Sequence, residues 1–335
     1  MKAIGYTKNL PATDERSLQE FDVPEPAPGP RDLVVEVKAV SVNPVDVKLR
    51  VASKAENGPK ILGFDAAGIV KAVGPEASLF APGDEVYYAG AIDRPGSNSA
   101  LQAVDERIVA LKPKSLTYAE AAALPLTAIT AWELLFDRLG VAEGGGAGET
   151  LLIIGGAGGV GSILIQIARQ LTKLKVIATA SRAETQAWVK RMGAHHVIDH
   201  RDDMSAQMKA LGVAPRYVAG LTGTERHFPA IAQLLTPQGK FALIDDPDPK
   251  TIDVSLLKRK SLSLHWEFMF TRSLFGTPDM IEQNKLLTRI GSLVDEGRIL
   301  TTANQDGGSM TPENLRQAHL LQESGRAIGK TVLEL

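Results

Sequence analysis

The residues with the clearest chemical meaning are Gly156, Gly158 and Gly161, which fit the pattern G-x-G-x-x-G. They lie between an apolar run, 151–154, and an apolar-periodic segment, 160–171, so a predicted strand precedes the loop and a predicted helix follows it. Such glycines permit a tight turn, close approach to a pyrophosphate and close packing of helix on strand. The alternative is a glycine-rich turn without a ligand. The predicted dinucleotide-binding residues here are Gly156, Gly158, Gly159, Val160 and Gly161.

The residues after the next predicted strand indicate which dinucleotide binds. NAD-binding domains carry an acid about 20 residues beyond the loop, where it bonds the ribose 2′-hydroxyl. Here Ser181 and Arg182 come first, and no carboxylate occurs before Glu184. A hydroxyl and a guanidinium suit a 2′-phosphate through charge-assisted hydrogen bonds, and His200 and Arg201 supply a second clamp. The sequence therefore predicts NADPH as the cofactor, against the alternative that Arg182 and His200 are ordinary surface residues.

The composition limits what kind of protein positions these residues. The chain has 335 residues, of which 44% are hydrophobic and 23% charged, as in globular proteins, and its length predicts two domains. The 37 basic and 39 acidic residues leave a net charge of −2, so we expect neither nucleic acid nor a membrane surface as a partner. The longest apolar run, 121–132, is interrupted by Pro125, and no signal peptide is recognisable, so we expect a cytoplasmic protein.

The order of predicted elements indicates an α/β fold in two parts. The first 110 residues are β-rich and punctuated by turns, which favours a barrel or sandwich, with strands expected at 33–40, 67–74, 84–88 and 106–110. A helix is expected over 119–139. Six strand-like runs then alternate with helices at 160–171 and 183–192, which is typical of a doubly wound parallel sheet. These runs are 151–154, 175–179, 196–198, 217–221, 241–244 and 262–266, followed by a helix at 278–294 and a strand at 329–334.

At this point the chain resembles the medium-chain dehydrogenase/reductase superfamily over essentially its whole length. The glycine loop carries the match together with 63–68 and 80–86, while 42–46 and 122–128 resemble its quinone oxidoreductase branch. The stretch 261–275 resembles a subgroup labelled zinc-type alcohol dehydrogenase-like. The resemblance implies a Rossmann NADP-binding domain at 121–271. It also implies a GroES-like β-barrel catalytic domain, formed by residues 1–120 and completed by 272–335.

The residues at the zinc-ligand positions of that superfamily cannot bind zinc in this chain. The resemblance places Asn43 where zinc alcohol dehydrogenases have a Cys ligand, and Phe64 where they have a His ligand. The chain contains no cysteine, so the third ligand and the four-Cys structural lobe are absent as well. His195 and His196 are adjacent and point differently, which disfavours a metal cluster there. We therefore predict no metal and no Lewis-acid oxidation of alcohols.

The resemblance also assigns roles near the nicotinamide. It places Asn43 at the nicotinamide end and makes Asp46 an orienting group. Lys48 aligns with a Tyr in several quinone reductases, where it would donate a proton, although a surface lysine is an equally good interpretation. Thr127 and Thr130 either contact the nicotinamide side or pack inside a helix.

The expected protein is thus an NADPH-dependent, zinc-independent oxidoreductase that transfers hydride to a small-molecule quinone or activated enone in a cleft between the two domains. An enone or alcohol/aldehyde reductase on the same scaffold and a non-enzymatic NADPH-binding protein are the alternatives. The apolar edge strand at 262–266 is expected to pair with a second copy, which makes the protein a homodimer.

Overall fold

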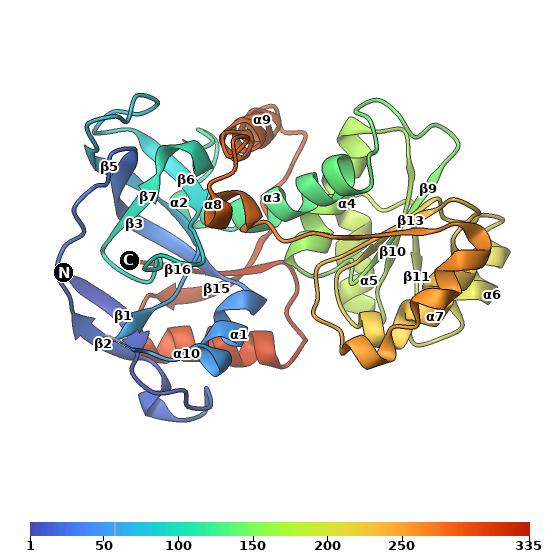
Figure 1. Cartoon of the computed structure of the whole chain (residues 1–335), viewed down its shortest axis with the longest axis horizontal. Coiled ribbons are helices and arrows are strands. Elements are labelled where there is room, and N and C mark those ends of the chain that lie inside the picture. The colour runs from blue at the N-terminus through green and yellow to red at the C-terminus, as the bar shows by residue number, and fades with distance from the viewer. Residues whose placement is uncertain (57) are drawn as a thin grey trace. The chain divides into compact units, whose positions relative to one another are not determined.

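The computed structural model describes residues 1–56 and 58–335 and divides into two compact units (Figure 1). Unit 1 consists of Met1–Ile129 and Phe270–Leu335, and unit 2 of Thr130–Met269. The boundary between Ile129 and Thr130 lies within α3 (Pro125–Trp132), whereas the ranges expected from the sequence divide the chain after residue 120.

Unit 1 is built on a seven-stranded sheet of order β15-β16-β3-β5-β6-β8, in which β7 also pairs with β3, and on a three-stranded sheet of order β2-β1-β4. Branched and aromatic side chains of these strands form one buried cluster that includes Val35, Val40 and Tyr88. The strands are β1 Lys2–Tyr6, β2 Gln19–Asp22, β3 Asp32–Val42, β4 Lys60–Ile61, β5 Asp65–Val73, β6 Glu85–Ala89, β7 Leu101–Asp105, β8 Val109–Leu111, β15 Ala303–Ser309 and β16 Lys330–Glu334. The helices that lie wholly within unit 1 are α1 Pro44–Ala52, α2 Tyr118–Ala122, α8 Thr271–Phe275, α9 Glu282–Asp295 and α10 Pro312–Glu323.

Unit 2 is a single parallel sheet with helical connections. Its strand order is β11-β10-β9-β12-β13-β14, which is 3-2-1-4-5-6 when the strands are counted along the chain. This confirms the predicted α/β doubly wound sheet, in which ligands bind at the carboxyl ends of the strands where the order reverses. The strands are β9 Thr150–Ile154, β10 Lys175–Thr179, β11 His196–Ile198, β12 Tyr217–Gly220, β13 Lys240–Leu243 and β14 Ser263–Trp266. The α-helices between them are α4 Gly159–Leu171, α5 Ala183–Arg191, α6 Met204–Ala210 and α7 Thr224–Leu234.

Two local expectations from the sequence are wrong. The strand expected at 106–110 begins only at Val109, because the Asp105 carboxylate accepts the backbone N–H of Arg107 and caps a 3-10 turn, Glu106–Ile108. The single helix expected over 119–139 is divided into α2, α3 and a π-helix, Glu133–Arg138. Pro125 lacks a backbone N–H and stands at the first position of α3, where proline is tolerated.

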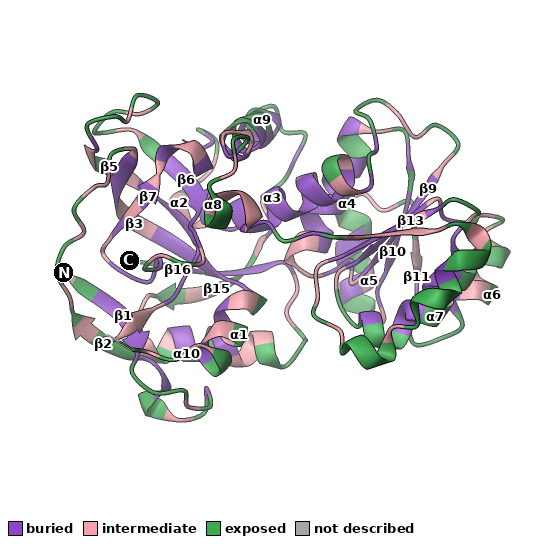
Figure 2. Cartoon of the chain, in the orientation of Figure 1, coloured by how far each residue is buried: buried purple, intermediate pink, exposed green. Residues whose placement is uncertain are grey.

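The segment Tyr118–Arg138 is the one helical stretch in residues 1–56 and 58–335 that is long and apolar enough to cross a membrane by length and composition. However, 83% of its most apolar window is buried inside the protein. Figure 2 shows α3 buried along its length. The segment therefore has the burial of a core helix.

Candidate functional site

The three glycines of the loop after β9 differ in their surroundings and therefore in their roles. A Cβ on Gly156 would lie 2.8 Å from the Ala178 Cβ atom, and a Cβ on Gly161 would lie 2.5 Å from the carbonyl oxygen of Gly155. These two glycines therefore allow close packing within unit 2. A Cβ on Gly158 would meet only the Gly155 oxygen, at 3.7 Å. The fold leaves Gly158 open, so its backbone can be approached by a pyrophosphate.

The loop is attached to the end of β10. The backbone N–H of Gly155 donates to Thr179 Oγ1 at 3.0 Å, and that of Gly156 donates to the Thr179 carbonyl at 3.2 Å. Gly155 has φ of +86°, a conformation that favours glycine. Gly158 precedes the first turn of α4, where Gly159 and Val160 lie. The predicted loop residues thus sit together at the amino end of a helix, the arrangement that binds phosphate groups.

The cationic residues predicted to select the 2′-phosphate follow β10 and β11. Arg201 pairs with Asp199 at 2.7 Å and also donates to the Ser181 carbonyl at 2.6 Å, which joins the two strand ends. Arg182 Nε lies 2.8 Å from Glu184 Oε1 at the start of α5. Arg201 therefore connects the segments that follow β10 and β11, which carry the residues predicted to select the 2′-phosphate.

Sequence reasoning missed two residues at this edge, Arg226 and His227, which lie in the first turns of α7. The His227 ring lies edge-on to the His200 ring, with centroids 5.8 Å apart. Burial lowers the pKa of both imidazoles, and the charge of Arg226 acts in the same direction. A signal existed, since α7 follows β12, the strand next to β9 at the point where the strand order reverses.

In unit 1, Asn43 and Asp46 belong to a buried polar network. Asn43 is 1% exposed, and its side-chain amide donates to Asp65 Oδ2 at 2.9 Å. Asp46 accepts the backbone N–H groups of Asn43 at 2.7 Å and Gly63 at 3.0 Å, so it orients two chain segments. Burial raises the pKa of Asp46 to about 7.

The remaining predicted residues have simpler surroundings. Lys48 is exposed on α1. Thr127 is 2% exposed and donates to the Leu124 carbonyl at 3.0 Å, while Thr130 is 5% exposed on the same helix. The Thr127 hydroxyl therefore already donates to the residue that precedes α3.

A zinc centre does not fit the residues present. Phe64 is 2% exposed and its ring packs against that of Phe270, with centroids 4.9 Å apart. The Asn43 amide, which stands at the other ligand position implied by the resemblance, is engaged by Asp65. In the part of the chain that the structure describes, no three His, Cys, Asp or Glu side chains gather as a metal site would require.

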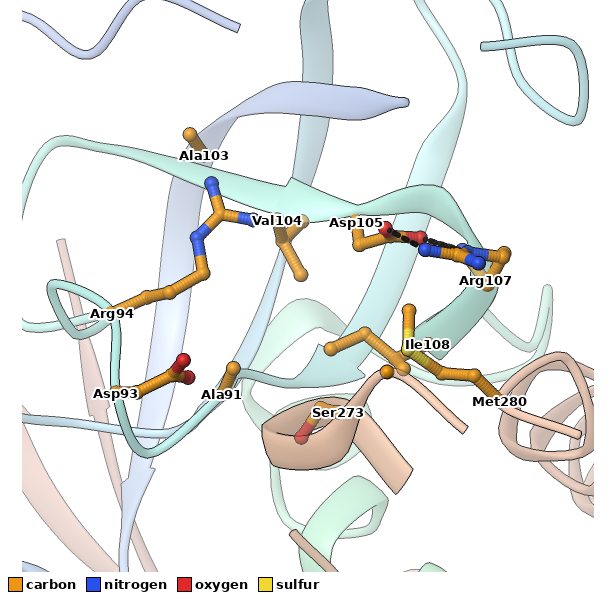
Figure 3. Close-up of a pocket in the computed structure, with 11 residues that line it drawn as sticks. Ala91, Asp93, Arg94, Ala103, Val104, Asp105, Arg107, Ile108, Ser273 and Met280 are labelled. Atoms are coloured by element: carbon orange, nitrogen blue, oxygen red, sulfur yellow. Dashed lines mark hydrogen bonds and ion pairs between the residues drawn. The ribbon is translucent and has the colours of Figure 1, made fainter. Parts of the chain in front are cut away.

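A separate cavity of about 120 Å³ lies in unit 1, between β7 and α8 (Figure 3). The positive charges of its two arginines are balanced by carboxylates. Arg94 donates two hydrogen bonds to Asp32, at 2.8 and 2.7 Å, and Arg107 forms an ion pair with Asp105 at 2.7 Å. The cavity is also smaller than the roughly 300 Å³ of small ligand pockets. Its lining residues are Ala91, Asp93, Arg94, Ala103, Val104, Asp105, Arg107, Ile108, Ser273, Gly276 and Met280.

Comparisons with known proteins agree with this geometry. Residues 29–127 match the alcohol dehydrogenase GroES-like domain and residues 159–287 match the zinc-binding dehydrogenase family. A zinc-type alcohol dehydrogenase-like protein of Staphylococcus aureus is 40% identical over the full length of both chains. A solved Rhizobium etli protein, provisionally assigned as a zinc-dependent alcohol dehydrogenase, is 57% identical, with a TM-score of 0.96 over 100% of this chain and 98% of that one. A mycobacterial protein solved with NADPH is 27% identical, with a TM-score of 0.84 over 100% of both chains.

The chain therefore belongs to the medium-chain dehydrogenase/reductase superfamily, a family of NAD(P)-dependent oxidoreductases, as its sequence predicts. The Staphylococcus aureus and Rhizobium etli relatives carry zinc-type names, whereas the residues of this chain at the ligand positions do not fit a zinc centre.

Proposed function

We propose that this protein is an NADPH-dependent, zinc-independent oxidoreductase of the quinone reductase type, acting on a quinone or an activated enone. The observation that carries the proposal is the loop after β9, which leaves Gly158 open while Gly156 and Gly161 are closely packed. NADPH, when bound, supplies the hydride. The mycobacterial relative solved with NADPH supports this choice of cofactor.

The residues of unit 2 would hold the cofactor. The loop from Gly156 to Gly161 takes the pyrophosphate, while Ser181, Arg182 and His200 take the 2′-phosphate. Thr130, also of unit 2, and Thr127, which belongs to unit 1, are proposed on the nicotinamide side. Arg226 is proposed to add positive charge at the ribose end, which favours the phosphorylated cofactor over NADH, whereas the charge of Arg201 is balanced by Asp199.

The proposed class of acceptor rests on the residues at the zinc-ligand positions. With Asn43 and Phe64 at the zinc-ligand positions, these residues cannot hold a metal ion that would polarise an alcohol or a carbonyl. An acceptor that spreads the developing negative charge by conjugation is therefore favoured. We propose Asn43 and Asp46 as residues that act at or beside the nicotinamide end, and Lys48 as a proton donor to the reduced acceptor.

Oxidation of NADPH and NADH against a panel of quinones, enones, aldehydes and alcohols tests the proposal. We expect turnover with quinones or enones, preference for NADPH, and unchanged rates after chelator treatment. Activity confined to aldehydes would favour the carbonyl reductase alternative, and NADPH binding without turnover would favour a non-enzymatic binding protein.

The roles of Asn43 and Lys48 need a separate measurement. Asn43→Ala and Lys48→Met should slow hydride transfer in single-turnover stopped flow and change the NADPH dissociation constant only modestly. If both variants transfer hydride at the parent rate, neither residue acts on the acceptor.

We also propose that two copies pair through β14, the edge strand of the sheet in unit 2. β14 ends the strand order, and Trp266 at its end is 55% exposed. An uncovered edge with a large apolar side chain favours pairing with another strand.

A further inference from the structure

The buried network around Asn43 contains a cation that the sequence did not reveal. The Lys330 ammonium, on β16, donates to the Val42 carbonyl at 2.9 Å, to Asp65 Oδ2 at 2.9 Å and to Asn43 Oδ1. Lys330 is 2% exposed and Asp65 is fully buried. An ammonium has three N–H donors, so all three are used on oxygen atoms.

The acceptors are arranged as they would be around a bound cation. Asp65 Oδ2 also accepts from Ser41 Oγ and from the Asn43 amide, each at 2.9 Å, and its Oδ1 accepts from the Leu126 backbone N–H at 2.7 Å. The negative charge of Asp65 is thus met by one ammonium and three neutral donors. Burying that carboxylate without a cation beside it would be strongly unfavourable.

We propose that Lys330 is the resident cation of this position: its tethered ammonium occupies the oxygen atoms of Asn43, Asp65 and Val42, holds the first two side chains in place and leaves no room for a metal ion. Lys330 is thus a positioning residue for Asn43. The inference goes beyond the proposed function, because it concerns unit 1 and holds whichever cofactor or acceptor the protein uses.

The Lys330 ammonium differs from a metal ion because it is covalently attached to the chain. A metal must be captured from solution and released against competing ligands, whereas Lys330 is present at one copy per chain whenever β16 is paired with β3. It also joins three strands, since Asp65 begins β5 and Asn43 directly follows β3. Loss of the ammonium should therefore affect both the melting temperature and the placement of Asn43.

The test removes the ammonium and supplies it again. Lys330→Ala should lower the melting temperature by about 5–15 °C, since it leaves a buried carboxylate uncompensated. Millimolar n-propylammonium, which replaces the missing atoms, should recover much of that loss, whereas tetramethylammonium at the same ionic strength should not. Lys330→Met is the matched control, because its side chain fills the space and leaves no room for the added amine.

A double substitution adds a second criterion. Lys330→Met combined with Asp65→Asn removes both charges and should melt higher than Lys330→Met alone. The proposal would be overturned if Lys330→Ala melted at the same temperature as the parent. It would also be overturned if neither n-propylammonium nor tetramethylammonium changed the melting temperature of Lys330→Ala.

Zinc binding by the parent protein can overturn the proposal even if the variants do not fold. Equilibrium dialysis against Zn²⁺ should leave less than a tenth of an equivalent on the parent. Binding of one equivalent of Zn²⁺ to the parent, lost in the Asp65→Asn variant, would contradict the proposal. The NADPH dissociation constant depends mainly on the proposed cofactor residues of unit 2, so it should change no more in Lys330→Ala than in Asn43→Ala. A parent protein that binds no NADPH would contradict the proposed cofactor and leave the role of Lys330 untouched.

Discussion

At the scale of single residues, the glycines of the loop after β9 have two different roles: two are needed for packing within the fold, and one leaves space for a ligand. Gly156 and Gly161 face atoms at 2.8 and 2.5 Å from a would-be Cβ, whereas Gly158 faces almost nothing. The sequence motif predicts all three glycines but cannot rank them, because their neighbours come from β10 and from the loop's own backbone. The structure supplies that ranking, and it can be tested.

Gly158→Val should abolish NADPH binding and leave the melting temperature within about 1–2 °C of the parent. The backbone there has φ of −72°, which an L residue adopts without strain, and a Cβ would meet only the Gly155 oxygen, at 3.7 Å. Fluorescence titration with NADPH and a thermal melt measure the two effects. Gly161→Val is the control and should lower the melting temperature, because its Cβ would meet backbone oxygen. Equal destabilisation by both would show that Gly158 is also a packing residue.

Arg182→Ala should weaken NADPH binding by roughly 10- to 150-fold, the range expected for a lost hydrogen bond to a charged group. NADH affinity should change little, because it lacks the 2′-phosphate. Dissociation constants for both cofactors provide the measurement, with Lys190→Ala, an exposed cation on α5, as control. Similar weakening of NADPH and NADH would mean that Arg182 supports the fold.

At the scale of elements, alternation of strands and helices was enough to predict the sheet of unit 2, since parallel strands buried on both faces appear as short apolar runs. It failed where side chains compete with the backbone, as at the Asp105 cap, and where a helix is interrupted, as at Pro125. Contacts between distant elements were out of reach. Lys330 and Asn43 are 287 residues apart, and nothing in the local pattern of either strand indicates the other.

The packing of α1 against α10 gives a prediction of pH dependence. Arg50 is fully buried and donates to His319 Nδ1 at 3.3 Å, so the imidazole is neutral. Burial, with Arg50 acting in the same direction, lowers the pKa of His319 from 6.5 to about 3. The unfolded chain then binds a proton that the folded chain does not, so the stabilisation is complete above pH 6.5 and is lost as the pH falls towards 3.

At pH 5, which is 1.5 units below the ordinary pKa of 6.5, this loss is about 2 kcal/mol at about 1.36 kcal/mol per unit. His319→Asn keeps an acceptor near the Nδ1 position but does not titrate, so its unfolding free energy should fall less between pH 7 and pH 5. Urea denaturation at the two pH values measures this difference. His196→Asn, on the exposed end of β11, should behave as the parent does. The same pH slope in His319→Asn and parent would exclude His319 as the cause.

At the scale of the whole molecule, the proposed pairing of two copies depends on an edge strand of the sheet in unit 2. The sheet has two edge strands, β11 and β14, and both are short. They differ in their apolar surface, since Trp266, the last residue of β14, is 55% exposed and Phe268, two residues beyond the strand, is 45% exposed.

Trp266→Lys should convert a dimeric parent into a monomer, because a charge on an edge strand opposes pairing with another strand. Light scattering after size-exclusion chromatography gives the mass directly. His196→Lys places the same charge on the opposite edge and should remain dimeric. A monomeric parent, or a dimer that survives Trp266→Lys, would remove β14 as the interface.

The position of β16 in the chain has a consequence for synthesis. Asp65 is made early, but the ammonium that neutralises it belongs to a strand that follows all of unit 2. On the ribosome, residues 130–269 therefore emerge complete while unit 1 still lacks β16, one of the three strands that pair with β3. Because domains generally fold as units during translation, unit 2 should acquire its structure first, and unit 1 should remain open to chaperones and proteases until Lys330 has left the exit tunnel.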